Sequence, residues 1–196
     1  MAFVRRKLAD IGVKAPFPDF VEPALASSIE RVPSGERWIN EIKFDGYRVQ
    51  THIQNDAVKI FTRRGHDWTR RFKKAAHDAW RIKAKSAVLD GEIVVPAADG
   101  TTDFSVLQNE LKGSSDKIVL VAFDLLYLDG RDLRKLPLWQ RKAALKKIVE
   151  GTTSSLARAS RSRARRCSRT PASSGWKAWS RRSATLPTQR DAATTG

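Results

Sequence analysis

A lysine suited to nucleophilic chemistry lies in the segment Glu41-Ile42-Lys43-Phe44-Asp45-Gly46-Tyr47-Arg48. The apolar neighbours Ile42 and Phe44 would partly withdraw the Lys43 amine from water, which disfavours its ammonium form and leaves it able to attack an electrophile. Asp45 and Arg48 add charges, and the glycine between them allows a sharp turn or a close approach to a ligand. A solvated charged turn is the alternative interpretation, and this segment alone favours neither because short motifs match by chance.

Two further segments carry residues that could complete a site. Glu92 lies in the apolar run 87–95, where an acid has a desolvation cost unless it meets a partner, so it is a candidate ligand for a metal or a ribose hydroxyl. The alternative for Glu92 is a structural ion pair with an arginine. Arg63 begins the basic turn 63–67, which follows a strand just as Lys43 does, so both residues could line one pocket. Arginines that are merely solvated are an equally common outcome at such a turn.

The strands that must position these residues are readily identified. Residues 47–54 and 58–62 flank an Asn55-Asp56 turn, which is typical of an antiparallel hairpin. Further strands are predicted at 87–95 and 118–128. The second of these should be covered on both faces because it is almost continuously apolar.

Helices are predicted between and after the strands. One should run from Trp68 to about residue 85, capped by Asp67, with its aromatic residues facing the core. A short helix should follow Asp103, and a longer one should begin at Pro137 and reach Val149. Hairpins mixed with helices indicate an α+β domain with antiparallel sheets and packed helices.

Composition limits the class of protein. A chain of 196 residues with 41% apolar content corresponds to one domain, or one domain with appendages. We expect a cytoplasmic protein, because no secretory leader is visible and the longest apolar run, 118–128, is interrupted by Asp124. The single cysteine, Cys167, permits no internal disulfide and agrees with that compartment.

The net charge of +16 is unevenly distributed. Residues 151–196 hold ten Lys and Arg against one acid and contribute +9, so the first 150 residues contribute +7. Such a balance favours a polyanionic partner, since Lys and Arg near phosphates release counterions. Simple solubility charge is the alternative.

Four motifs occur in the order found in one group of enzymes. The segment 43–48 matches the pattern Lys-x-Asp-Gly-x-Arg, and it is followed by Phe61-Thr62-Arg63, Asp90-Gly91-Glu92 and the strand 122–130 that bears Phe123. Together they resemble the covalent nucleotidyltransferases, which comprise ATP-dependent DNA ligases, RNA ligases and mRNA capping enzymes. The flanking residues 20–26 and 38–48 are most similar to the ligase domain of bacterial ligase D, the enzyme of non-homologous end joining. The resemblance covers roughly residues 16–150 and implies an ATP-grasp-like adenylation domain.

The resemblance also implies a chemistry. Lys43 would attack the α-phosphate of ATP, release pyrophosphate and hold AMP as a phosphoramide, and AMP would pass to the 5′-phosphate of a nick before the 3′-hydroxyl displaces it. Mg²⁺ or Mn²⁺ would stabilise the negative charge on each phosphate in transit. By the same resemblance, Glu41 and Ile42 would contact the adenine, and Phe123 would cover the face of the base. Arg48 and Arg63 would bind the ribose and the phosphates. Glu92 would contact the ribose and the metal, and Asp45 would act at the metal or at the reacting strand end.

The resemblance extends to partners and location. The expected substrate is nicked or broken double-stranded DNA, and end-joining proteins are expected as further partners. The protein should act as a monomer, away from membranes, in the bacterial cytoplasm and on the nucleoid when it is bound to DNA.

The chain departs from the family pattern after Glu150. The expected Glu-Gly-x-x-x-Lys and Lys-x-Lys motifs are missing, and we expect no OB-fold. We therefore divide the chain into a basic leader (1–15), a partial, incomplete adenylation domain (16–150) and an Arg/Ser-rich tail (151–196). The stretch through Thr170 has too few large apolar residues to bury a core, so it is expected to be disordered or to arise from a shift of reading frame.

The frame-shift hypothesis has a specific basis. If GC-rich codons for residues 175–182 are read from their third base, they can encode Leu-Glu-Gly-Val-Val-Ser-Lys, which contains the missing ligase motif. The same offset around residues 155–162 can give a second ligase-like string. We therefore expect a DNA ligase adenylation domain of impaired activity, and the alternative is a non-catalytic, basic DNA-binding fragment that uses the arginine tail.

Overall fold

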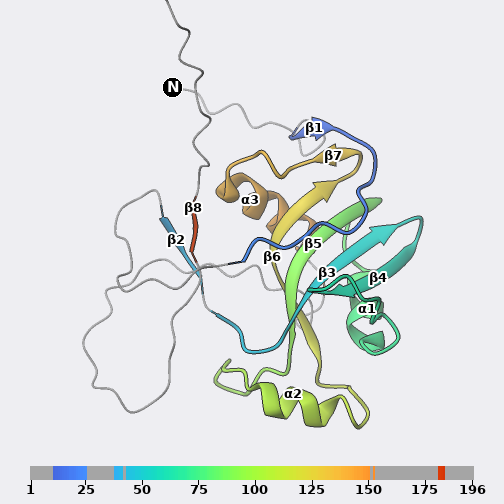
Figure 1. Cartoon of the computed structure of the whole chain (residues 1–196), viewed down its shortest axis with the longest axis vertical. Coiled ribbons are helices and arrows are strands. Elements are labelled where there is room, and N and C mark those ends of the chain that lie inside the picture. The colour runs from blue at the N-terminus through green and yellow to red at the C-terminus, as the bar shows by residue number, and fades with distance from the viewer. Residues whose placement is uncertain (1–10, 26–37, 42, 151, 153–180, 184–196) are drawn as a thin grey trace, which may run out of the picture.

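The computed structural model describes residues 11–25, 38–41, 43–150, 152 and 181–183 (Figure 1). A six-stranded antiparallel sheet forms its centre, with the strand order β1-β7-β6-β5-β3-β4. Its strands are β1 (Val13–Lys14), β3 (Tyr47–Gln54), β4 (Ala57–Thr62), β5 (Ser86–Val94), β6 (Val119–Leu128) and β7 (Arg131–Asp132). A separate pair is formed by β2 (Trp38–Asn40) and β8 (Arg181–Ser183). The predicted antiparallel sheet is confirmed, and the first strand draws residues from the segment that we described as a leader.

The β3–β4 hairpin forms as its turn residues predict. Asn55 and Asp56 both have positive φ, at 51° and 58°, and Gln54 pairs with Ala57 across the turn. Two left-handed residues match the twist of the flanking strands, and Asn and Asp tolerate that conformation better than most residues. The strand predicted at 118–128 is also confirmed, since β6 is buried along nearly all of its length.

In the described part of the chain, three helices accompany the sheet: α1 (Lys73–Ala79), α2 (Phe104–Glu110) and α3 (Leu138–Val149). The last two agree with prediction, and the Asp103 carboxylate caps α2 by accepting from the backbone N–H groups of Ser105 and Val106. The helix predicted from Trp68 to about residue 85 is wrong at both ends, since α1 begins at Lys73 and ends at Ala79. The backbone N–H of Trp68 donates to the carbonyl of Ile60 in β4, which holds the residues before α1 in a turn.

The prediction for Trp80 is also wrong, because 61% of this residue is exposed. Phe72, Ala75, Ala79 and Ile82 are the buried residues of this segment, and they recur at the spacing of one helical face. Trp80 is adjacent to Ala79 and therefore turned away from that face. Asp67 is not a helix cap, since its carboxylate accepts from the backbone and hydroxyl of Thr69.

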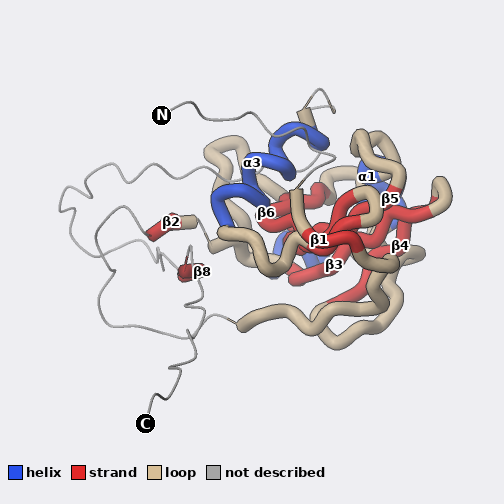
Figure 2. Tube along the Cα trace, turned by 90° about the horizontal axis from the view of Figure 1, so that it is seen from above, coloured by secondary structure: helices blue, strands red, loops and turns tan. Residues whose placement is uncertain are grey.

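The hydrophobic core lies on one face of the sheet. Figure 2 shows α1 and α3 on that side of the strands. The core contains alternate residues of β3, β5 and β6 together with Ala144, Leu145 and Ile148 of α3. The other face of the same strands therefore carries the polar residues of the candidate site.

Residues 15–25 form an extended segment that crosses the second face of the sheet (Figure 1). The Gln50 side chain accepts from the backbone N–H of Val21 (2.9 Å) and donates to its carbonyl (2.8 Å). The Phe17 ring makes edge contacts with His52 and Tyr127. Residues 15–25 are therefore attached to β3 and β6 by both hydrogen bonds and aromatic contacts.

The expectations for the tail fall almost entirely outside the described residues, which after Glu150 include only Thr152 and β8. In the part of the chain that is described, no helix is long and apolar enough to span a bilayer.

Candidate active site

The loop that carries Lys43 enters β3 and is fixed by its backbone. The N–H of Asp45 donates to the Thr102 hydroxyl (2.8 Å), and the N–H of Gly46 donates to Oε1 of Glu92 (3.1 Å). Both acceptors belong to segments more than 40 residues away in the chain. The side chain of Lys43 is therefore presented from a loop whose position is set by the sheet and by the loop before α2.

Close backbone approach explains the glycines of two motifs. A Cβ on Gly46 would lie 2.1 Å from the carbonyl oxygen of Ile93, so no other residue fits without moving the loop away from β5. A Cβ on Gly91 would lie 2.7 Å from the carbonyl oxygen of Val121. The two glycines thus allow the Lys43 loop to lie against β5 and β5 to lie close to β6.

Lys43 itself is exposed, and Phe44 is half-buried. The expectation that apolar neighbours withdraw the amine from water is therefore wrong for this structure, and Ile42 lies outside the described residues. Asp45, the next candidate along the loop, is also exposed. Both functional groups are accessible to a ligand.

Arg48 is held between an acid and an aromatic ring. Its guanidinium donates twice to the Asp90 carboxylate, at 2.9 and 2.7 Å, and its Cζ lies 5.2 Å from the centroid of the Phe123 ring. The sequence had offered Glu92 an ion pair with an arginine as its alternative role, but in this structure Asp90 is the partner of Arg48. A bidentate pair and a stacked ring fix the plane of the guanidinium.

Glu92 stands opposite Arg48 in the pairing of β3 and β5. Burial raises the pKa of its carboxyl from 4.5 to about 7, with a further contribution from Asp45, against the opposing effects of the Gly46 N–H, Arg48 and Lys43. A carboxyl that changes charge near neutral pH close to an exposed lysine is typical of a functional site. Among the described residues, no group of three or more His, Cys, Asp or Glu side chains is placed to hold a metal ion.

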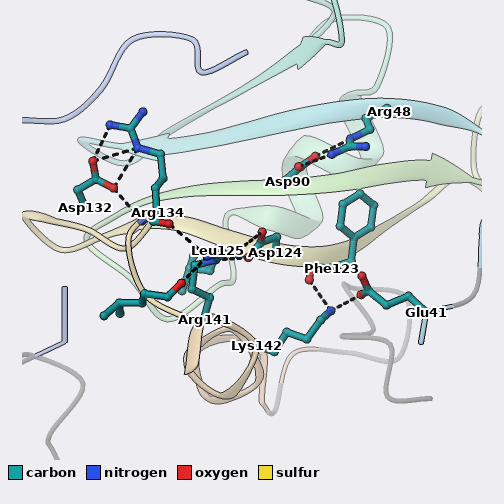
Figure 3. A network of polar contacts seen from close by, with 11 residues as sticks. Glu41, Arg48, Asp90, Phe123, Asp124, Leu125, Asp132, Arg134, Arg141 and Lys142 are labelled. Carbon is teal, nitrogen blue, oxygen red and sulfur yellow. Dashed lines mark hydrogen bonds and ion pairs between the residues drawn. The ribbon is translucent and has the colours of Figure 1, made fainter. Parts of the chain in front are cut away.

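Glu41 is buried and meets a residue from α3. Its carboxylate accepts from the Lys142 ammonium, which also donates to the backbone carbonyl of Phe123 (2.7 Å). Figure 3 shows Lys142 reaching both acceptors, while its neighbour Arg141 binds the Asp124 carboxylate through two nitrogens. Helix α3 therefore contacts both the Lys43 segment and the Phe123 strand.

Arg63 lies in the exposed turn after β4, at the edge of the sheet. Gly65 shapes this turn, with φ of 80° and an N–H that donates to the Thr62 carbonyl. The prediction that Arg63 and Lys43 line one pocket stays a prediction.

Sequence reasoning missed three residues that bond to this site. Asp90 could have been found, because it lies two residues before Glu92 and therefore on the same face of a strand. For Thr102 and Lys142, no pattern in the neighbouring sequence indicated a place in the site. They become neighbours of the Lys43 segment only through contacts that span 57 and 101 residues.

Comparison with known proteins now gives the class of the chain. Residues 23–170 match the family model of the ATP-dependent DNA ligase domain, and the chain belongs to this family. The motifs that resembled a nucleotidyltransferase are thus the motifs of a DNA ligase domain.

The relatives point more specifically to the ligase domain of LigD. The chain is 41% identical over 141 residues to the multifunctional non-homologous end joining protein LigD of Pseudomonas aeruginosa, a match that covers 71% of this chain and 17% of that protein. It is 33% identical over 144 residues to the SPbeta prophage-derived DNA ligase-like protein LigB of Bacillus subtilis, covering 68% of this chain and 52% of that protein. The chain thus spans about a sixth of the first relative and about half of the second.

Solved structures agree with the sequence comparison. A mycobacterial DNA ligase D complexed with ATP and MES superimposes with a TM-score of 0.54 at 32% identity, over 62% of this chain and 40% of that chain. The ligase domain of Mycobacterium tuberculosis LigD gives 0.53 at 33% identity with the same coverage. The chain is homologous to the LigD ligase domain in sequence and in fold.

Proposed function

We propose that this chain is the adenylyltransferase part of an ATP-dependent DNA ligase and that Lys43 accepts AMP. The observation that supports this best is the meeting of separate motifs around one loop. Gly46 of the Lys43 segment is bonded to Glu92, and Arg48 of the same segment lies over the Phe123 ring. Such convergence leaves the exposed Lys43 amine beside a cation, an acid and an aromatic surface.

The proposed reaction has three transfers. First, Lys43 Nζ, in its unprotonated form, attacks the α-phosphorus of ATP. A nitrogen–phosphorus bond forms, and the bond to the pyrophosphate oxygen breaks. Second, an oxygen of a DNA 5′-phosphate attacks the same phosphorus and Lys43 leaves. Third, the DNA 3′-hydroxyl attacks the activated 5′-phosphate, a phosphodiester forms, and AMP departs.

The proposed roles of the side chains are those that the resemblance to DNA ligases implies for these motifs. Phe123 offers a ring to the adenine face, and Glu41, with Ile42, contacts the edge of the base. Arg48 would give up part of its hydrogen bonding to Asp90 in order to reach the ribose or the phosphates. Arg63 would approach the same groups from the edge of the sheet. Glu92 would accept from a ribose hydroxyl, and Asp45 would act near the reacting strand end. Fixed cations of this kind stabilise charge that develops on a phosphate.

Mg²⁺ or Mn²⁺ is proposed as the accompanying ion. Asp45 and Glu92 fit such an ion, because hard carboxylate oxygens are available from adjacent positions and Mg²⁺ is commonly held by one or two carboxylates together with substrate phosphates. When bound, the ion would neutralise phosphate charge. The chain's own contribution is to hold those two carboxylates close to Lys43.

Further proposals concern partners and the tail. The expected DNA is a nicked or broken duplex, end-joining proteins are expected as partners, and the chain is expected to be monomeric and associated with the nucleoid when it is on DNA. We also propose that residues 151–196 supply no OB-fold and that this chain seals DNA poorly. Sequencing the gene tests the frame-shift hypothesis, which fails if the alternative frame carries stop codons through this region.

The central proposal is tested by incubating the full chain with ATP labelled at the α-phosphate and with Mg²⁺. Label should become attached to the protein, be lost in Lys43→Ala, and persist in Lys85→Ala, which removes a lysine that is also exposed. Attached label that survives in Lys43→Ala would overturn the assignment of the nucleophile. Salt-sensitive DNA binding with no label in any variant would instead support the non-catalytic DNA-binding alternative.

A further inference from the structure

Lys142 is a charged residue that none of the ligase-like motifs contains. It lies in α3, and only 12% of its side chain is exposed. Its two acceptors are the Glu41 carboxylate, whose side chain is 5% exposed, and the carbonyl of Phe123. A buried ammonium ion carries a desolvation cost that only such partners offset, so this contact is a specific one.

The two acceptors of Lys142 belong to different parts of the site. Glu41 precedes the proposed nucleophile Lys43 by two residues, and Phe123 lies in β6. One ammonium group thus joins the segment that presents the nucleophile to the strand that presents the aromatic ring (Figure 3).

The other end of the Lys43 loop is already fixed. Asp45 and Gly46 are held by Thr102 and Glu92 through their backbone N–H groups. The bond from Lys142 to Glu41 anchors the loop on its N-terminal side, where, among the described strands, the neighbouring β2 pairs with β8 and not with the six-stranded sheet. With both ends held, the loop has one position relative to the ring of Phe123.

We propose that Lys142 is a positioning residue for adenylation: it fixes the distance between Lys43 and the adenine-binding surface by bonding Glu41 and the Phe123 carbonyl together. This inference rests on the proposed function. A reacting amine must lie close to the α-phosphorus in a defined direction, and displacement of about 1 Å can lower the rate by about a hundredfold. Loss of Lys142 should therefore affect the rate of AMP transfer as well as the binding of ATP.

The test compares Lys142→Met with Lys142→Arg and with Lys146→Met, which removes an exposed lysine one turn further along α3. With the full chain, Mg²⁺ and α-labelled ATP, we expect Lys142→Met to lower the rate of protein labelling at saturating ATP by about tenfold to a hundredfold and to raise KM. Lys142→Arg should recover part of the rate, and Lys146→Met should match the parent. Labelling by Lys142→Met at the parental rate and KM would overturn the proposal.

A second measurement remains informative even if the parent chain forms no lysyl-AMP. Amide hydrogen exchange of the peptide spanning residues 41–48 reports the order of the loop directly. Exchange there should be at least several-fold faster in Lys142→Met than in Lys146→Met, while residues 119–128 of β6 stay protected in both. Equal exchange in the two variants would refute the positioning role, whereas an absence of label with the expected exchange pattern would count against the proposed function alone.

The double variant Glu41→Gln/Lys142→Met guards against simple misfolding. It removes the buried carboxylate together with its partner, so the fold should recover stability relative to Lys142→Met. The labelling rate should nevertheless stay below that of the parent, because the link to the Phe123 carbonyl and the adenine contact proposed for the Glu41 carboxylate are both missing. Full recovery of the rate would show that Lys142 only neutralises Glu41, which contradicts the proposal.

Discussion

Replacing Glu92 with glutamine should stabilise the folded chain at neutral and alkaline pH. The substitution keeps a side-chain oxygen that can accept from the Gly46 N–H, which now lies 3.1 Å from Oε1 of Glu92. It removes a negative charge that burial disfavours, as the rise in the pKa of Glu92 from 4.5 to about 7 shows. The site thus holds an ionisable group at a cost to the stability of the fold.

The magnitude follows from that pKa difference. A rise from 4.5 to about 7 corresponds to roughly 3 kcal/mol, because each pKa unit is worth about 1.4 kcal/mol. The folded chain binds more protons than the unfolded chain between these two values, so the Glu92 contribution to stability falls as pH rises through this window. The advantage of Glu92→Gln should be small near pH 4.5, grow with pH, and level off above about pH 7.

Urea unfolding without nucleotide or divalent metal, at several values between pH 5 and 8, measures this difference. His52 also titrates, since burial lowers its pKa to about 4, but the residue is common to both proteins and cancels in the comparison. Glu22→Gln, at an exposed position, is the matched control and should change stability by less than about 0.5 kcal/mol at every pH. A difference between Glu92→Gln and the parent that does not vary with pH would refute the reasoning.

The remaining predictions concern packing and buried charge. Gly46→Ala should lower the free energy of unfolding by about 2 kcal/mol or more, because its Cβ would lie 2.1 Å from the carbonyl oxygen of Ile93; an unchanged urea midpoint would contradict the close approach. Asp124→Ala should cost about 3–5 kcal/mol by leaving Arg141, whose side chain is 14% exposed, without its carboxylate partner. Asp132→Ala breaks a comparable ion pair with an arginine at the surface and should cost about 0–1 kcal/mol of folding stability. If thermal melts show equal losses of stability for Asp124→Ala and Asp132→Ala, then burial does not determine how much each pair contributes.

Local patterns predicted much of the fold. The Asn55-Asp56 turn, the apolar β6 strand and the Asp103 cap each depend on residues close together in the chain, and each is confirmed. The helix start at Trp68 was wrong because its backbone bonds to β4, a tertiary contact that outweighs helical spacing. Trp80 was misplaced because it directly follows the buried Ala79 and is therefore turned away from the buried face of the helix.

Only part of the candidate site could be predicted from the sequence. Arg48, Glu92 and Phe123 lie near one another as the motifs indicate. Asp90, Thr102 and Lys142 were missed, and the place of Arg63 in the site stays a prediction.

The motif residues could be recognised by their types and by their order along the chain. The pairing of Arg48 with Asp90, and not with Glu92, depends instead on the geometry of adjacent strands. Strand register places Arg48 opposite Glu92, yet the guanidinium reaches diagonally to Asp90, a choice that only side-chain conformation decides. Glu92 is left with the Gly46 N–H as its hydrogen-bond partner, and burial raises its pKa against the opposing effects of that N–H and of Arg48.

The exposure of Lys43 changes how its proposed reactivity must be explained. Apolar neighbours do not cover the amine, so burial by the chain does not prepare it as a nucleophile. What the chain does provide is a loop whose backbone is fixed by Thr102 and Glu92, together with an arginine held over an aromatic ring. The nucleotide would then exclude water from the amine when its base lies on that ring. Binding energy from the base would in this way be used to bring the phosphate to a lysine that is otherwise in water.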